Sequence, residues 1–194
     1  MTPARTTVRT SLTDPLLIAE VAAAGGVIGM TICPGRKGPG ARGGAWDRDP
    51  ALDMAVVAAW RPGAVVTLME TPEFAQYGVA GLPRAMAGLD ARWFHLPIRD
   101  VDVPDAAFEV RWGDAGSALR AMLRSGGRVL VHCVGGLGRT GLVAARLLVE
   151  LGTDPGQAVA AVRGARPGAI ETAPQLRHVL ACRAVAENLS PGRA

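Results

Sequence analysis

A single cysteine stands where a strongly apolar segment meets a glycine-rich one. Residues 128–133 read as a buried strand that ends at Cys133, and the loop that follows contains three glycines before Arg139 begins a helical pattern. In such a loop, successive backbone N–H groups turn inward at the positive end of a helix, which is the geometry of an anion site. Glycine is needed where the backbone takes a positive φ or approaches a ligand closely. The segment therefore predicts an anion-binding loop with a thiol at its base.

The chemistry expected of this loop is nucleophilic attack on a bound oxyanion. A thiol beside a helix N-terminus and an arginine favours the reactive thiolate form. The planar guanidinium of Arg139 suits two phosphate oxygens. The alternative is an ordinary strand-to-helix turn with a buried cysteine and a solvated arginine. In the anion-site interpretation Cys133 is the nucleophile, and the phosphate-binding residues are Val134, Gly135, Gly136, Leu137, Gly138 and Arg139.

The order His132-Cys133-x-x-Gly136-x-x-Arg139-Thr140 resembles the signature loop of cysteine-dependent protein-tyrosine and dual-specificity phosphatases. The longer string HCVGGLGRTGLVAARLL is similar to the cyclin-dependent-kinase-associated phosphatases. The resemblance covers about residues 29–175, and its supporting stretches are 32–35, 95–100 and 166–172. It implies an enzyme without metal or cofactor that hydrolyses phosphomonoesters in two steps through a phosphocysteine. A kinase as target is implied by the resemblance only, and the substrate stays open.

The resemblance also implies a general acid on a loop upstream of the signature, where three aspartates compete. Asp100 best matches the family position after His-x-Pro-Ile. Asp105 follows a proline and precedes a helical pattern, so it also fits a helix N-cap. Asp102 also fits a solvated loop residue. We expect Asp100 to protonate the departing oxygen and then to activate water.

Three further residues have both a catalytic and a structural interpretation. His132 should point to the opposite side of the strand from Cys133, and we expect it to hold the loop and tune the thiol through hydrogen bonds. Thr140 is expected to donate a hydrogen bond to the sulfur, or else is a first-turn helix residue. Gln175 could position the hydrolytic water, but Thr172-x-x-Gln175 is also a capping box.

Residues outside this loop carry weaker signals. Cys33 is either a core residue or a resolving thiol that protects Cys133 as a disulfide. Three basic residues on a long loop, Arg36, Lys37 and Arg42, form either a substrate rim or scattered solvated charges. His95 and His178 are interpreted as structural.

The elements that must position the loop alternate along the chain. Strands are expected at 16–21, 26–33, 64–69, 92–98 and 128–133. Helices are expected from an N-cap at Asp49 to about residue 61, over 106–124, 141–151, 154–163 and 174–187, with one or two short pieces in 73–89. Residues 34–44 lack periodicity and read as a long loop. Strands separated by helices predict a three-layer α/β sandwich with a mostly parallel central sheet. One domain over 13–189 is expected, between loose tails at 1–12 and 190–194.

Composition bounds the remaining possibilities. With 194 residues, 49% of them apolar, the chain has material for one core and is not intrinsically disordered. The net charge is +4, and all but one of the 21 basic residues are arginine. Because these residues are scattered rather than clustered, we expect anionic partners but no nucleic acid. The three cysteines show no metal-site spacing. The most apolar window, residues 16–33, contains Glu20 and a Gly-Gly break, so we expect no membrane association and a cytoplasmic protein.

The leading hypothesis is a dual-specificity protein phosphatase acting on phosphotyrosine and on phosphoserine or phosphothreonine. A sulfurtransferase would use the same kind of loop cysteine without needing a separate acid. A catalytically silent phosphoprotein-binding module is the third class. We expect a phosphorylated protein or peptide as the partner.

Overall fold

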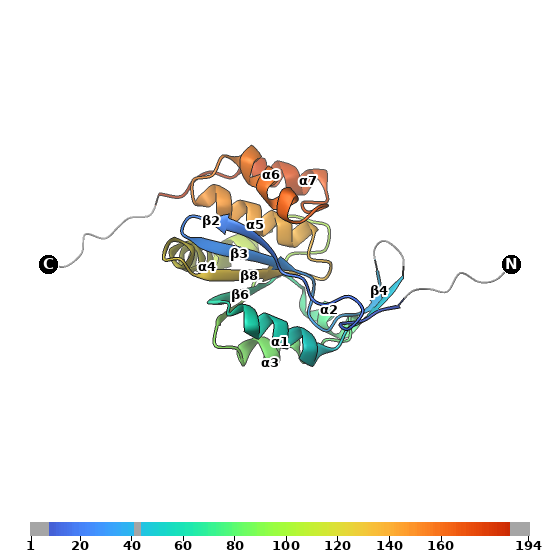
Figure 1. Ribbon diagram of the computed structural model, residues 1–194. Helices are drawn as coiled ribbons and strands as arrows, with labels where there is room; N and C mark the ends of the chain where they lie inside the picture. The colour runs from blue at the N-terminus through green and yellow to red at the C-terminus, as the bar shows by residue number, and fades with distance from the viewer. Residues whose placement is uncertain (1–7, 41–43, 187–194) are drawn as a thin grey trace.

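The computed structural model describes residues 8–40 and 44–186, and its centre is a five-stranded sheet with strand order β2-β3-β8-β6-β7 (Figure 1). Only the β2–β3 pair is antiparallel; the other three pairs are parallel. The strands are β2 (Ala19–Ala23), β3 (Gly26–Thr31), β6 (Ala64–Thr67), β7 (Arg92–His95) and β8 (Arg128–His132). The predicted mostly parallel sheet is confirmed.

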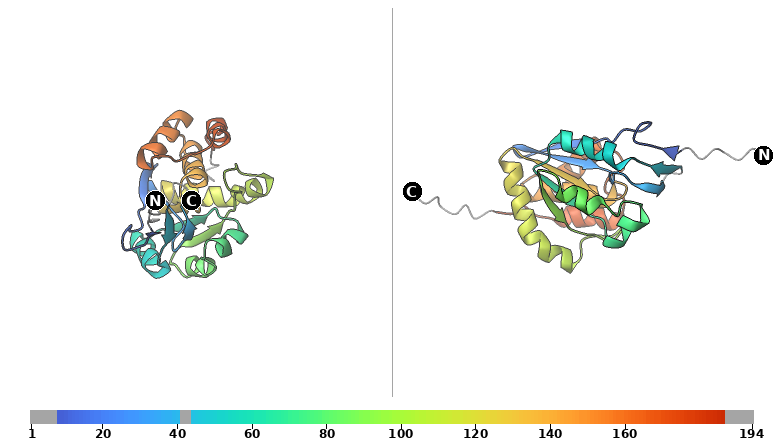
Figure 2. Two further views of the ribbon diagram at one scale, coloured as in Figure 1. Left: turned by 90° about the vertical axis from the view of Figure 1, so that its right-hand side faces the viewer. Right: turned by 90° about the horizontal axis from the view of Figure 1, so that it is seen from below.

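Helices cover both faces of this sheet, which makes three layers (Figures 1 and 2). Phe108, Leu119 and Leu142 from α4 and α5 belong to the core on one face. Val57 and Met86 from α1 and α3 belong to the core on the other face. The helices are α1 (Pro50–Trp60), α2 (Thr71–Gln76), α3 (Leu82–Ala87), α4 (Ala106–Arg124), α5 (Gly138–Glu150), α6 (Pro155–Ala165) and α7 (Ala173–Ala181). The predicted α/β sandwich is therefore confirmed.

Short-range signals place most helix ends as predicted. The Asp49 side chain accepts hydrogen bonds from the Ala51 and Leu52 amides at the start of α1. Arg61 ends this helix with a φ of 52°, next to the predicted Pro-Gly break. Asp105 caps α4 by accepting from the Phe108 amide at 2.8 Å. Such caps satisfy N–H groups that have no partner inside the helix.

The predicted loose tail and long loop are wrong where the chain is described, because both contribute to a second, small sheet. Its strand order is β1-β5-β4, with β1 (Val8–Arg9), β4 (Lys37–Pro39) and β5 (Ala45–Asp47). The Arg9 guanidinium stacks on the Trp46 ring at 4.1 Å, and the buried Ser11 hydroxyl donates to Asp53 Oδ1 at 2.8 Å. These long-range contacts order residues 8–12, which carry no apolar period of their own. Residues 1–7 and 41–43 and the predicted tail 190–194 lie outside the described residues.

Other differences concern boundaries. Strand β2 begins at Ala19 rather than at residue 16, and the last helix ends at Ala181 rather than near residue 187. Strand β7 ends at His95, two residues before Pro97, which cannot donate to a sheet ladder. No helix within 8–40 and 44–186 combines the length and apolar character that a membrane span requires.

Candidate active site

The signature loop, residues 133–138, lies at the carboxyl end of β8 in the middle of the sheet. Cys133 is buried at the base of this loop, and the Gly136 amide donates to its Sγ at 3.2 Å. Gly136 has a φ of 64°, and a Cβ there would lie 2.3 Å from the carbonyl oxygen of Thr31. This position therefore requires glycine, both for its backbone angle and for the close approach to β3.

Arg139, in the first turn of α5, is buried and held by several acceptors. Its Nη1 and Nη2 donate to the two carboxylate oxygens of Glu73 at 2.7 and 2.9 Å. Nη1 also donates to the Ile98 carbonyl at 3.0 Å. Burial alone would lower the pKa of the guanidinium, but the Glu73 carboxylate, together with Cys133 and Asp100, outweighs burial and the pKa is raised. Arg139 is thus a fixed cation beside the thiol.

One nitrogen of Arg139 remains available. Its Nε is buried and has no hydrogen-bond partner within the described part of the chain. A buried unpaired donor is costly unless a ligand or water satisfies it. The position of this donor, on the guanidinium at the end of the loop, suits an oxyanion oxygen.

The structure separates the three candidate acids. Asp100 Oδ1 lies 2.9 Å from Arg139 Nη2, and the carboxylate is 62% exposed. Asp102 Oδ1 accepts from the Val103 amide at 2.8 Å, and Asp105 is the cap of α4. Among the described contacts, Asp100 is the one of the three that reaches Arg139.

His132 lies on the other face of β8 from Cys133. Its imidazole is fully buried, and Nε2 is 2.7 Å from the Thr67 hydroxyl oxygen, which also accepts from Trp93 Nε1 at 2.9 Å. Burial lowers the pKa of His132 to about 4. The imidazole is therefore neutral near pH 7, and its contacts anchor β8 to β6 and β7.

Thr140 departs from its catalytic interpretation, and Gln175 makes the contacts of its structural one. The Thr140 hydroxyl is buried without a hydrogen-bond partner among the described residues, so the predicted bond to the sulfur is not formed. Gln175 makes the predicted capping box with Thr172. Its Nε2 also donates to the Asp102 carbonyl at 3.1 Å. The amide of Gln175 thus connects the start of α7 to the loop that carries the aspartates.

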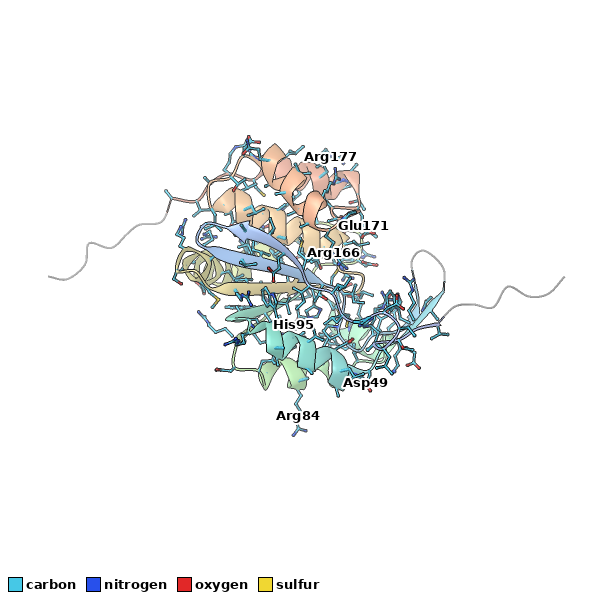
Figure 3. The ribbon with its side chains drawn as sticks, in the orientation of Figure 1. Asp49, Arg84, His95, Arg166, Glu171 and Arg177 are labelled. Atoms are coloured by element: carbon cyan, nitrogen blue, oxygen red, sulfur yellow. The ribbon has the colours of Figure 1, made fainter. Side chains whose placement is uncertain are left out.

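Three residues that the sequence did not assign support the site from other elements. Glu73, in α2, is the carboxylate that holds Arg139. Arg166, which is labelled in Figure 3, donates to the carbonyls of Gly135, at 3.4 Å, and of Gly136. Glu171, also labelled there, accepts from the Gly138 amide at 2.8 Å. Stretch 166–172 was a supporting match in the sequence, but that match assigned no role to either residue.

The predicted basic rim is wrong where it is described. Arg36 is buried and donates to the carbonyls of Val134, at 3.4 Å, and Pro39, at 2.7 Å, so it braces the signature loop from outside. Lys37 is paired with Asp47. Arg42 lies outside the described residues. Arg36 is therefore not a solvated charge, whereas Lys37 forms a partly exposed ion pair, which agrees with the alternative of a solvated charge.

Cys33 belongs to the apolar core beneath α1 and α3. Burial raises the pKa of its thiol, and its amide donates to the Val134 carbonyl at 3.2 Å. His95, labelled in Figure 3, has its Nε2 2.8 Å from the Met69 carbonyl and stacks on Trp93. His178 is partly buried, and burial lowers its pKa. The core interpretation of Cys33 and the structural interpretation of His95 agree with this placement.

Comparison with known proteins places this site in a family. Residues 52–153 match the family described as polymorphic toxin system, DSP-PTPase phosphatase. The chain is 38% identical to cyclin-dependent kinase inhibitor 3 of Rattus norvegicus over 90 residues and 39% identical to that of Homo sapiens over 88 residues. Each alignment covers 44% of this chain and only 40% of the relative.

Solved structures agree over a greater length. Kinase associated phosphatase (KAP), in a form whose catalytic cysteine is replaced by serine, shares 26% identity at a TM-score of 0.73 and covers 85% of this chain and 92% of its own. Tk-PTP in its active form shares 27% identity at a TM-score of 0.55, with 78% and 88% covered. Because the matching family model spans more than half of the chain, the protein belongs to the DSP-PTPase phosphatases of polymorphic toxin systems, within the cysteine-dependent protein-tyrosine and dual-specificity phosphatases.

Proposed function

We propose that this protein hydrolyses phosphomonoesters of phosphotyrosine and of phosphoserine or phosphothreonine in protein substrates, in two steps through a phosphocysteine. The observation that carries the proposal is the convergence of three groups from separate elements. The Cys133 sulfur receives the Gly136 amide at 3.2 Å, and Arg139 beside it is paired with Asp100 at 2.9 Å. A nucleophile, a cation for the phosphoryl oxygens and an exposed carboxyl group are what phosphoryl transfer to a thiol needs.

In the first step, the Cys133 thiolate attacks phosphorus and the bond to the leaving oxygen breaks. The Asp100 carboxyl group donates a proton to that oxygen, so an alcohol leaves. Arg139 Nε and the loop amides other than that of Gly138, which donates to Glu171, stabilise the charge on the phosphoryl oxygens, where charge develops in the transition state. Since the Asp100 side chain is exposed on a loop before α4, it can exchange its contact with Arg139 for one with the substrate.

In the second step, water attacks phosphorus and the S–P bond breaks. The Asp100 carboxylate takes the proton of the water, inorganic phosphate forms, and the thiolate of Cys133 leaves. Each cycle consumes one phosphomonoester and one water molecule, and the carboxyl group of Asp100 is restored for the next cycle. A sulfurtransferase would have no use for this carboxyl group, which favours the phosphatase.

The test is turnover of a panel of phosphotyrosine and phosphothreonine peptides by the wild type and by Cys133→Ser. We expect the variant to lose turnover and to keep its affinity for phosphate, because Arg139 and the loop amides remain. Cys182→Ser is the matched control, since this cysteine is partly buried and bonded to the His178 carbonyl, away from the loop.

The outcomes distinguish the alternatives. Residual turnover by Cys133→Ser close to that of the wild type would overturn the assignment. Persulfide formation with thiosulfate, without phosphatase activity, would indicate a sulfurtransferase. Phosphopeptide binding by the wild type without turnover would indicate a silent binding module. The kinase target that the resemblance implies is a further proposal, which a phosphorylated kinase as substrate would test.

A further inference from the structure

Two neighbouring hollows lie beside the signature loop. The first has a volume of about 610 Å³, and its wall includes Leu17, Trp46, Gly135 and Leu137. The second has a volume of about 480 Å³. Leu17, Leu137 and Arg166 belong to both walls, so the two hollows form one groove that runs along the loop. We call it the flanking groove.

The arginines in the wall of the flanking groove are engaged within the protein. Arg166 donates to the carbonyls of Gly135 and Gly136, and Arg36 donates to that of Val134. Burial lowers the pKa of both guanidiniums. These cations therefore brace the outer side of the loop through donors that reach backbone carbonyls, and Arg36 Nε is buried without a partner among the described residues.

The remaining charged groups of the wall are engaged as well. Arg9 stacks on the Trp46 ring at 4.1 Å. Asp14 accepts from the Thr13 hydroxyl at 2.9 Å, and Glu171 accepts from the Gly138 amide at 2.8 Å. The wall thus holds three arginines and two carboxylates, which nearly balance in charge. Most of its other residues are apolar: Pro15, Leu17, Ile32, Trp46 and Leu137.

The apolar surface is concentrated where the hollows meet. Leu17 is 75% exposed and lies in both walls, so an apolar partner in the groove would remove its side chain from water. Apart from Arg166, the wall of the second hollow consists of apolar residues, which are Leu17, Ile18, Ala19, Leu137, Ala165 and Pro167. Pockets of this volume bind ligands mainly through apolar contact.

We propose that the flanking groove binds the substrate segment next to the phosphorylated residue and selects an apolar side chain in it, with Leu17 as a specificity-determining residue. The inference rests on the proposed function and deepens it, because it names the substrate class as apolar-flanked phosphopeptides. The groove shares Gly135 and Leu137 with the phosphate loop, so a residue one to three positions from the phosphorylated one reaches it at about 3.3–3.6 Å per residue.

The experiment measures kcat/KM for phosphotyrosine peptides in which leucine replaces serine at each of three positions on either side of the phosphotyrosine. In the wild type we expect leucine at one position or more to raise kcat/KM by about tenfold, the usual effect of filling an apolar pocket. In the Leu17→Ser variant, the ratio of kcat/KM for the leucine peptide to kcat/KM for the serine peptide should fall to about two or less. Leu12→Ser is the matched control, because Leu12 is 80% exposed in the same segment and lies outside both hollows; it should keep the wild-type ratio.

Three results would overturn the inference. They are a wild-type ratio near one at every position, an equal fall of the ratio in Leu17→Ser and Leu12→Ser, and a preference for glutamate or a second phosphate at the flanking positions. A small aryl phosphate, para-nitrophenyl phosphate, separates this failure from failure of the proposed function. If the wild type hydrolyses it while the peptide series shows no preference, the inference alone is wrong; if it is not hydrolysed, the phosphatase proposal is wrong.

Discussion

The Glu73–Arg139 pair offers a quantitative test of how the proposed phosphate site is held. Glu73→Gln removes the negative charge that compensates the Arg139 guanidinium. Only 1% of the Arg139 side chain is exposed. Removing one partner of a buried ion pair costs about 3–5 kcal/mol, because the other charge stays buried without compensation. Asp100, 2.9 Å from Nη2, still offsets part of the charge. We therefore expect a loss of about 3 kcal/mol in the free energy of unfolding.

The chain contains a matched control for this substitution. Glu109 binds Arg146 through both carboxylate oxygens at 2.6 and 2.8 Å, the same arrangement as at Glu73. The Glu109 side chain is 42% exposed, so water compensates much of the charge when the pair is broken. Pairs of this kind contribute about 0–1 kcal/mol. Glu109→Gln should therefore lower the free energy of unfolding by less than about 1 kcal/mol.

The assay is urea-induced unfolding of the wild type and both variants, with and without saturating inorganic phosphate. Phosphate returns negative charge to Arg139, so it should stabilise Glu73→Gln more than it stabilises the wild type or Glu109→Gln. A loss below about 1 kcal/mol for Glu73→Gln, or equal stabilisation of all three proteins by phosphate, would refute the claim that this carboxylate compensates Arg139.

Four further predictions concern the chemistry and the buried histidine. Asp100→Asn should slow the cleavage of phosphothreonine peptides far more than the cleavage of an aryl ester with an acidic leaving group, because a good leaving group departs without a proton. The same selective defect in Asp102→Asn or Asp105→Asn would reassign the general acid. Arg139→Lys should weaken inhibition by vanadate and lower kcat, since a point charge cannot replace a planar fork, and unchanged inhibition would count against the oxyanion site. Burial lowers the pKa of His132 to about 4, so the unfolded chain takes up a proton at a higher pH than the folded protein does. The contribution of His132 to the free energy of unfolding is therefore complete above pH 6.5 and is lost as the pH falls towards 4, and the loss at pH 4.5 is about 2.5 kcal/mol. Between pH 7 and pH 4.5, the free energy of unfolding of His132→Asn should fall by about that much less than that of the wild type. A chelator should leave turnover intact, and a loss that a divalent cation restores would indicate a different phosphatase chemistry.

The local parts of the fold could be predicted because their causes lie within a few residues. Asp49 and Asp105 cap helices whose amides are two or three positions away. The signature loop is contiguous, so the strand, the glycines and the arginine that begins α5 could all be located in one segment. The capping box of Thr172 and Gln175 is local in the same sense.

The partners of this loop could not be predicted in the same way, because they come from distant parts of the chain. Glu73 is 66 residues before Arg139, and Glu171 is 33 residues after Gly138. An isolated glutamate in a short helix has no local signature that distinguishes an ion-pair partner from a solvated charge. The basic rim failed for the same reason, since the burial of Arg36 depends on the small sheet and on the loop above it.

The sequence by itself determined the order of strands and helices, most helix caps, and the segment in which a thiol, glycines and an arginine occur together. The tertiary structure decided which of three aspartates lies beside Arg139, which carboxylate compensates that cation, and how the first residues of the described chain form a wall next to the loop. The physical reason is that hydrogen-bonding and turn preferences act over a few residues, whereas burial and charge compensation depend on whatever the folded chain brings within a few ångströms.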